Sequence, residues 1–151
     1  MKAITLTPFE AAAVAFGEKW LLSRNSNSSH RGTLLIHAAE VEPLSYRPDL
    51  ASAATGAIVA IAELTLVVPL STINARSHDL VACVNRLPGC RRSWAEMRQQ
   101  PHNRDCQYAW VIEDVYRLPN PIHCNGHSGL WECDPSVLFD RLTHAKRLAT
   151  M

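Results

Sequence analysis

The sequence predicts an α+β domain built on a small mixed β-barrel. Five or six stretches have the composition of β-strands, two or three are helical, and the strands do not alternate regularly with the helices. The strongest strand signal is at residues 56–68, a nearly continuous apolar run that is rich in β-branched residues and contains Glu63. Its length is typical of a strand that crosses a core. At 151 residues, the chain is expected to form one domain, residues 1–151.

The first element is predicted to be a short strand at residues 2–6, followed by a helix. Thr7 suits the N-cap of that helix because its hydroxyl can accept a hydrogen bond from a backbone N–H of the first turn. Pro8 suits the first helical position. The helix is expected at residues 9–16, and Gly17 is expected to end it in a left-handed conformation.

A polar loop between two predicted strands forms the first candidate site. Residues 20–23 and 33–37 favour strands, and residues 25–29 between them are all Asn or Ser. We expect the two strands to form a hairpin. That arrangement would gather three cations and a histidine: Lys19, Arg24, Arg31 and His37. Such a group can bind an anionic or hydrogen-bonding ligand, although a solvated hairpin end explains the same residues.

Helical patterns also occur later in the chain. A weak pattern covers residues 50–54, and a clearer one covers residues 93–99. A C-terminal helix is expected from residue 135 to about residue 146, with Asp134 as its N-cap.

Two strand regions follow the central helical pattern. Residues 108–112 and 115–118 form either a strand pair or one bent strand. Pro119 and Pro121 come next, and because proline donates no backbone hydrogen bond, any pairing there is expected at a sheet edge. The last strand is expected at residues 129–133.

The charge balance points to a local site. The formal net charge of +1 excludes a protein that binds polyanions over its whole surface, and twelve of the fifteen cations are arginine. The planar arginine fork recognises phosphates, carboxylates and base edges by geometry as well as by charge. A basic face on this protein is therefore expected to be small and specific.

No segment has the length of a membrane span, and the start of the sequence lacks the apolar core of a signal peptide. We therefore expect a cytoplasmic protein with no membrane partner. The five cysteines are odd in number and include no Cys-x-x-Cys pair, which favours free thiols: Cys83, Cys90, Cys106, Cys124 and Cys133.

A metal site is a further alternative, because His123, Cys124, His127 and Cys133 lie close together in sequence. Structural zinc sites favour tight pairs of cysteines, and the Cys124-x-x-His127 spacing is half of such a motif. We predict neither a metal nor another cofactor.

An ordered series of short motifs resembles the ASCH domain family over nearly the whole chain. The motifs are Ala3-Ile4-Thr5-Leu6, Gly17-x-Lys19, Ser23-Arg24, Arg31-Gly32, Leu35-Ile36-His37-Ala38, Gly56-Ala57-Ile58-Val59 with Glu63-Leu64, Tyr108-Ala109-Trp110 with Glu113-Asp114-Val115, and Gly129-Leu130-Trp131. The resemblance implies a PUA-like fold, a β-barrel with peripheral helices, and RNA binding. Some similar bacterial proteins hydrolyse N4-acetylcytidine, and others are ribonucleases.

The expected partner is therefore RNA or a modified nucleoside. A binding module needs cations for phosphate, polar groups for a base edge and an aromatic surface for stacking. The residues that supply these groups are Lys19, Trp20, Arg24, Arg31, His37, Glu63 and Trp131. For Trp110 we favour packing in the core, and for His37 a hydrogen-bonded position in a strand is as consistent as a role in the site.

Catalysis is the alternative that the resemblance leaves open. Lys19 would act as the base or the oxyanion partner, and Glu63 would be the carboxylate beside it. The related hydrolases carry threonine three residues after the lysine, whereas this sequence has Leu22 there. Ser23 would then be the nearest hydroxyl, on the same face of a strand as Lys19.

Overall fold

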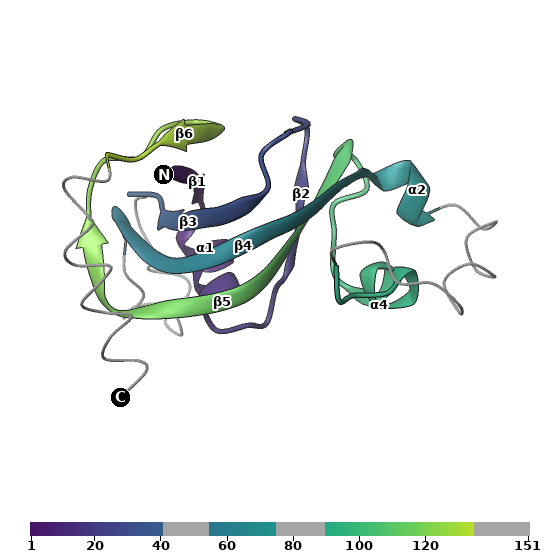
Figure 1. Ribbon diagram of the computed structural model, residues 1–151, viewed down its shortest axis with the longest axis horizontal. Helices are drawn as coiled ribbons and strands as arrows, with labels where there is room; N and C mark the ends of the chain where they lie inside the picture. The colour runs from purple at the N-terminus through teal and green to yellow at the C-terminus, as the bar shows by residue number, and fades with distance from the viewer. Residues whose placement is uncertain (41–54, 75–89, 135–151) are drawn as a thin grey trace. The chain divides into compact units, whose positions relative to one another are not determined.

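The computed structural model describes residues 1–40, 55–74 and 90–134. The predicted helices at residues 50–54 and 135–146, and Cys83, lie outside the described residues. The described elements are labelled in Figure 1: β1 (Lys2–Leu6), α1 (Pro8–Ala15), β2 (Leu21–Arg24), β3 (Gly32–Ala38), β4 (Ala57–Pro69), α2 (Leu70–Asn74), α4 (Trp94–Gln99), β5 (Tyr108–His123) and β6 (Leu130–Glu132).

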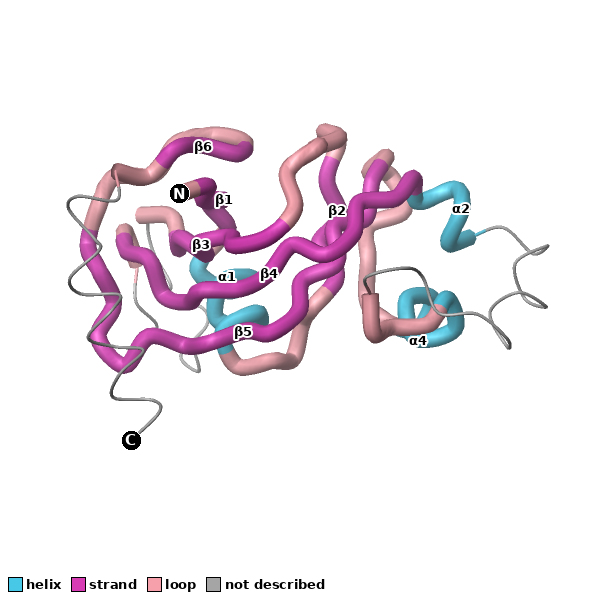
Figure 2. Tube along the Cα trace, in the orientation of Figure 1, coloured by secondary structure: helices cyan, strands magenta, loops and turns pink. Residues whose placement is uncertain are grey.

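The strands form one mixed sheet in the described part of the chain. Its order is β2-β5-β4-β3-β1-β6. β1 pairs with β3 in parallel and with β6 in antiparallel orientation, and β2 pairs with β5 in antiparallel orientation. Strands and helices do not alternate regularly along the chain, as the colouring in Figure 2 shows. The predicted α+β class is therefore confirmed.

The chain divides into two compact units. Unit 1 comprises residues 1–18, 33–62 and 115–151, and unit 2 comprises residues 19–32 and 63–114. Each unit has a cluster of buried apolar side chains. The cluster of unit 1 includes Ala3, Leu35, Ile58, Leu118 and Ile122, and that of unit 2 includes Leu21, Ile73, Trp94, Met97 and Val111.

The first two elements of unit 1 form as their local sequence predicts. The Thr7 hydroxyl accepts a hydrogen bond from the Glu10 N–H at 3.2 Å, and Pro8 occupies the first turn of α1. Gly17 follows the helix with a φ of +78°, a left-handed conformation that costs glycine little because it has no Cβ. The predicted helix start and stop are both confirmed.

The predicted hairpin between the second and third strands is wrong. β2 pairs with β5, and β3 pairs with β1. The connection between β2 and β3 is longer than most hairpin loops and satisfies its own backbone. The Asn27 side chain accepts from the Ser28 N–H at 2.8 Å, the Ser28 hydroxyl accepts from the His30 N–H at 3.1 Å, and Arg31 donates to the His30 carbonyl at 2.7 Å.

In unit 2, Trp110 fixes this loop to the sheet. Its side chain is 1% exposed, so the predicted core position is confirmed, and its indole N–H donates to the Ser26 carbonyl at 3.0 Å. A buried indole nitrogen needs an acceptor. The polar loop supplies one.

β5 is one bent strand, which settles the alternative that the sequence left open. Asp114 has a φ of 52°, an uncommon left-handed conformation for a residue other than glycine. β2 is in register with Tyr108–Val111, so Pro119 and Pro121 lie beyond the stretch that β2 pairs.

A buried carboxylate stabilises unit 2 beside this bend. Glu113 is 5% exposed, and it accepts hydrogen bonds from the Arg91 Nε at 2.8 Å and the Thr65 hydroxyl at 3.1 Å. Burial alone raises the pKa of Glu113, but hydrogen bonds from Arg91 and the Cys90 thiol outweigh burial and lower this pKa to about 2. Arg91 also bonds Asp114, so one guanidinium holds both acids.

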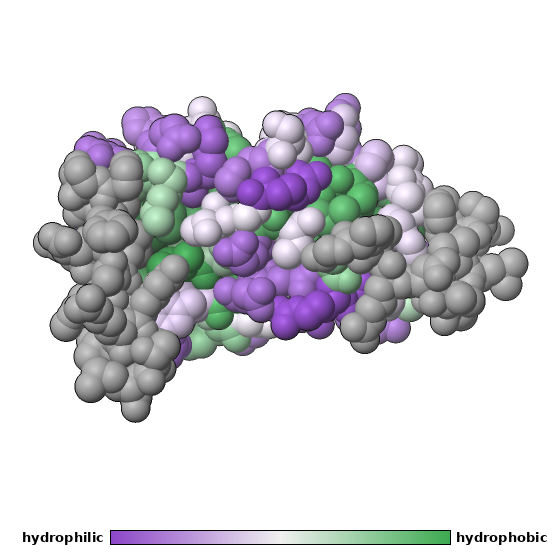
Figure 3. All heavy atoms as spheres, viewed as in Figure 1, coloured by the Kyte–Doolittle hydropathy of each residue, from purple (hydrophilic) through white to green (hydrophobic). Residues whose placement is uncertain are grey.

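The surface of the described residues mixes polar and apolar groups. On the face shown in Figure 3, hydrophobic residues lie in patches between hydrophilic ones. Phe16 is 64% exposed, and the Arg117 guanidinium lies 4.3 Å from the centre of its ring. Among the described helices, none is long and apolar enough to cross a membrane.

Replacing Glu113 with glutamine should remove part of the acid sensitivity of unit 2. Because the folded pKa of Glu113 is below its ordinary value of 4.5, its ionised form stabilises the fold above pH 4.5, and that contribution is lost as the pH falls through about 2. The contribution is at most roughly 3 kcal/mol. Urea unfolding from pH 7 to pH 2 should show a shallower loss for Glu113→Gln than for the wild type. Asp105→Asn, at an exposed position, is the control and should keep the pH dependence of the wild type. If the stability of Glu113→Gln falls with pH as steeply as that of the control, this role is contradicted.

Candidate functional site

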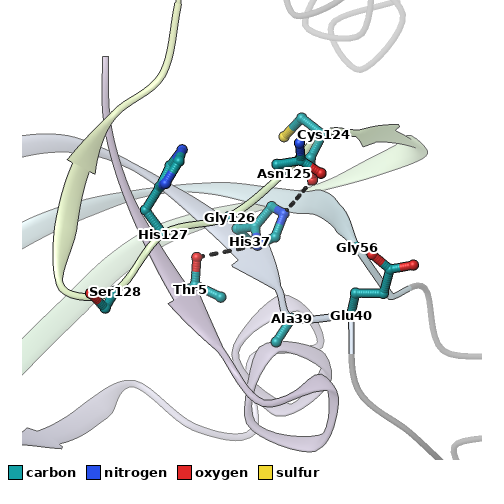
Figure 4. Close-up of a pocket in the computed structure, with 10 residues that line it drawn as sticks. All are labelled: Thr5, His37, Ala39, Glu40, Gly56, Cys124, Asn125, Gly126, His127 and Ser128. Atoms are coloured by element: carbon teal, nitrogen blue, oxygen red, sulfur yellow. Dashed lines mark hydrogen bonds between the residues drawn. The ribbon is translucent and has the colours of Figure 1, made fainter.

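Unit 1 contains a cavity of about 440 Å³. It lies beside the ends of β1, β3 and β5, and Figure 4 shows the side chains around it. Its lining residues are Thr5, His37, Ala39, Glu40, Gly56, Cys124, Asn125, Gly126, His127 and Ser128. The volume falls within the range of about 300–1,000 Å³ that is usual for small-molecule sites.

The sheet register brings two of the polar side chains together. Thr5 of β1 is the direct partner of His37 of β3 in the parallel pairing. Partners in register project from the same face of a sheet, and the Thr5 hydroxyl lies 3.3 Å from His37 Nδ1. The contact joins residues 32 positions apart.

The contacts of His37 assign its tautomer. Its Nε2 lies 2.8 Å from the Cys124 carbonyl oxygen, which can only accept, so Nε2 carries the hydrogen and donates it. In the neutral ring, Nδ1 then accepts from the Thr5 hydroxyl. Thr5 in turn accepts from the Trp131 indole N–H at 3.0 Å. His37 is 1% exposed, and both ring nitrogens have partners.

Trp131 of β6 also orients two imidazole rings. Its ring centre lies 5.6 Å from that of His37 and 5.1 Å from that of His127, and both contacts are edge-to-face. Edge-to-face packing is a favoured arrangement for aromatic rings. His127, which lines the cavity, is thereby held in a defined orientation.

Gly126 is required by the close approach of the loop to this network. A Cβ at this position would lie 2.5 Å from His37 Cε1 and 2.6 Å from the Thr5 hydroxyl oxygen. The loop is also held by the Cys124 N–H, which donates to the Gly56 carbonyl at 3.1 Å. The backbone of the loop thus packs directly against His37 and Thr5, where no side chain fits.

Four of the five cysteines lie in the described part of the chain, and all four are free thiols, as predicted: Cys90, Cys106, Cys124 and Cys133. Burial raises the pKa of the Cys124 and Cys133 thiols, which hydrogen-bond to each other. Among the described residues, no group of three or more His, Cys, Asp or Glu side chains could hold a metal ion.

The predicted site residues are divided between the two units. His37 and Trp131 belong to unit 1, and they meet at the cavity described above. The other five ligand-binding candidates belong to unit 2: Lys19, Trp20, Arg24, Arg31 and Glu63. The candidate nucleophile Ser23 is also in unit 2.

Within unit 2, three of these residues lie around α4 and the loop that follows it. The Lys19 amine lies 3.5 Å from the Pro101 carbonyl, and the Arg92 guanidinium lies 4.4 Å from the centre of the Trp20 ring. The Ser23 hydroxyl accepts a hydrogen bond from the Asn103 N–H at 2.8 Å. Leu22, three residues after Lys19, is fully buried.

The other unit 2 candidates have distinct surroundings. Arg31 is exposed and donates to two carbonyls of its own loop, whereas Arg24 lies in β2 opposite Tyr108. The Glu63 carboxylate lies near Gly32, where a Cβ would be 3.9 Å from its Oε2. The role of each in ligand binding stays a prediction.

Several lining residues carry no clear signal in the sequence. The contact of Thr5 with His37 follows only from the pairing of β1 with β3. Glu40 lies in a segment that the sequence indicates is a connector. In the sequence, His127 was a candidate only for the alternative metal site. A hint for the loop was Gly126 within Cys124-Asn-Gly-His127, because such glycines often mark a turn or a close approach of backbone.

The comparison with solved structures supports the fold. No family model matches the sequence, and no curated protein does so either. Among solved structures, the ASCH protein from Zymomonas mobilis is similar, with 15% identity and a TM-score of 0.54 over 94% of this chain and 93% of that one. Two of its mutants give TM-scores of 0.54 and 0.55 at 15% and 14% identity, again over 94% of this chain. The chain has the fold of the ASCH domain, and the predicted PUA-like α+β architecture is confirmed.

Substituting Gly126 with alanine tests how closely the loop packs against His37 and Thr5. The added methyl must displace His37 or Thr5, so we expect a loss of roughly 1–3 kcal/mol in the free energy of unfolding. Imidazole nitrogen NMR shifts of His37 should change as well. Gly129→Ala is the control, since a Cβ there meets nothing within 4 Å although its φ of +69° adds strain. Close packing of the loop against His37 is excluded if the His37 shifts are the same in both variants as in the wild type.

Proposed function

We propose that this ASCH-type module binds single-stranded RNA or a nucleoside, and that one unstacked base enters the cavity of unit 1. Proteins that recognise RNA in a sequence-specific way take up splayed bases by stacking and by hydrogen bonds to the base edges. The observation that carries the proposal is the cavity itself, a volume of suitable size whose lining includes the oriented His127 imidazole, the Asn125 amide and the Ser128 hydroxyl.

The charge of the lining supports a base more than a phosphate. Among the described residues that line the cavity there is no lysine or arginine, and Glu40 carries the one formal charge when histidines are counted as neutral. Phosphates are bound mainly by cations and backbone N–H groups. The cations of unit 2, Lys19, Arg24 and Arg31, are proposed together with Glu63 as a separate group of ligand contacts within that unit.

Binding rather than hydrolysis is the better-supported activity. The alternative, an N4-acetylcytidine hydrolase or ribonuclease that uses Lys19, Ser23 and Glu63, needs a hydroxyl or water beside the lysine. The buried Leu22 supplies no hydroxyl there, and the Ser23 oxygen already accepts from a backbone N–H.

The proposal predicts RNA binding that weakens with salt. A short fluorescently labelled single-stranded RNA should bind at low salt, and affinity should fall as salt rises because phosphate contacts release counterions. His127→Ala should weaken binding at all salt concentrations. Lys19→Ala should reduce the slope of log affinity against log salt by about 0.7, the value for one contact to a single strand.

Lys2→Ala is the matched control, because Lys2 lies outside the cavity and pairs with Glu132 at 2.9 Å. It should leave the slope nearly unchanged. The proposal is contradicted if no RNA binds at low salt. It is also contradicted if neither His127→Ala nor Lys19→Ala changes the affinity or its salt dependence.

A second assay separates binder from enzyme. Incubation of the protein with N4-acetylcytidine should release no cytidine, because Leu22 stands where the related hydrolases have threonine. Release that disappears in Lys19→Ala or Ser23→Ala would reverse the ranking of the two activities. Release that persists in both variants would exclude Lys19 and Ser23 as the catalytic residues.

A further inference from the structure

Glu40 lines the cavity and is an exposed residue. The residue comes two positions after the end of β3, and its stem passes over Gly56. A Cβ at position 56 would lie 3.5 Å from Glu40 Cβ and 3.7 Å from its Cδ, in contact with the whole stem. Gly56 has a φ of +60°, which other residues rarely adopt. The stem of the Glu40 side chain thus lies close to the backbone at position 56.

The carboxylate differs in chemistry from the rest of the lining. An ionised carboxylate only accepts hydrogen bonds, and its two oxygens can accept from two adjacent donors at once. The neighbouring lining groups include the Asn125 amide, the His127 imidazole and the Ser128 hydroxyl, each of which can donate. In Figure 4, Glu40 and His127 lie on opposite sides of His37. The lining therefore combines one carboxylate, which only accepts hydrogen bonds, with groups that can donate them.

Guanine has the base edge that fits this arrangement. Its N1–H and N2–H₂ groups are adjacent donors, and its O6 and N7 atoms are acceptors. Adenine and cytosine place an acceptor beside the exocyclic amine, and that acceptor would face a carboxylate oxygen without a hydrogen between them. Uracil has one N–H between two carbonyls. A carboxylate therefore penalises these three bases.

We propose that Glu40 determines the base specificity of the cavity by accepting hydrogen bonds from the N1–H and N2–H₂ of guanine. This inference rests on the proposed function and deepens it, because it names the base that enters the cavity. The negative charge of Glu40 also disfavours a phosphate inside the cavity. Because no phosphate contact is needed there, a nucleoside without phosphate serves as the test ligand.

Isothermal titration of the whole protein with four nucleosides tests the inference. Guanosine should bind about tenfold more tightly than inosine, which lacks the N2 amine, and more tightly than adenosine or cytidine. Guanosine 5′-monophosphate should bind no more tightly than guanosine. Glu40→Gln should remove the preference for guanosine over inosine, because the amide has one acceptor oxygen in place of two.

Glu18→Gln is the matched control, since Glu18 is an exposed acid of unit 1 outside the cavity, and it should keep the preference. Equal binding of all four nucleosides, or a guanosine preference that survives in Glu40→Gln, would overturn the inference and leave the proposed function standing. Absence of binding by every nucleoside and by single-stranded RNA would overturn both.

Discussion

The contact between Thr5 and His37 is the interaction on which the candidate site depends. It continues on one side to the Trp131 indole and on the other to the Cys124 carbonyl, so one chain of hydrogen bonds joins β1, β3, β6 and the loop after β5. A buried imidazole without partners would be costly, and this chain satisfies both of its nitrogens. The loop can approach because residue 126 has no Cβ, and a defined cavity is the result.

Local signals in the sequence account for the elements but not for their pairing. The cap at Thr7, the left-handed Gly17 and the apolar run of β4 depend on neighbouring residues, and each formed as predicted. The hairpin between β2 and β3 was wrong because strand pairing is decided by contacts far apart in sequence, such as that of Leu22 with Trp110. The polar residues 25–29 predict a turn, but they contain no information on which strand pairs with β2.

The same reasoning applies to the site. His37 could be predicted because a histidine within an apolar strand needs a partner, and Trp131 because it belongs to a recognisable motif. Thr5 belongs to such a motif as well, but its contact with His37 depends on the register of a parallel pair, and the position of Glu40 at the cavity depends on how the chain continues after β3. Glu113, with its lowered pKa, shows that a strong electrostatic cluster can serve stability, since its partners hold the bend of β5 within unit 2.

The most direct test of the central claim is an NMR titration that records backbone amide and imidazole nitrogen signals while guanosine is added. The account predicts that the signals of Asn125, Gly126 and His127 move together and saturate. It also predicts that His37 keeps its hydrogen on Nε2 throughout, because the Cys124 carbonyl holds it there. Saturable shifts confined to unit 2, with the signals of residues 125–128 unchanged, would contradict the account.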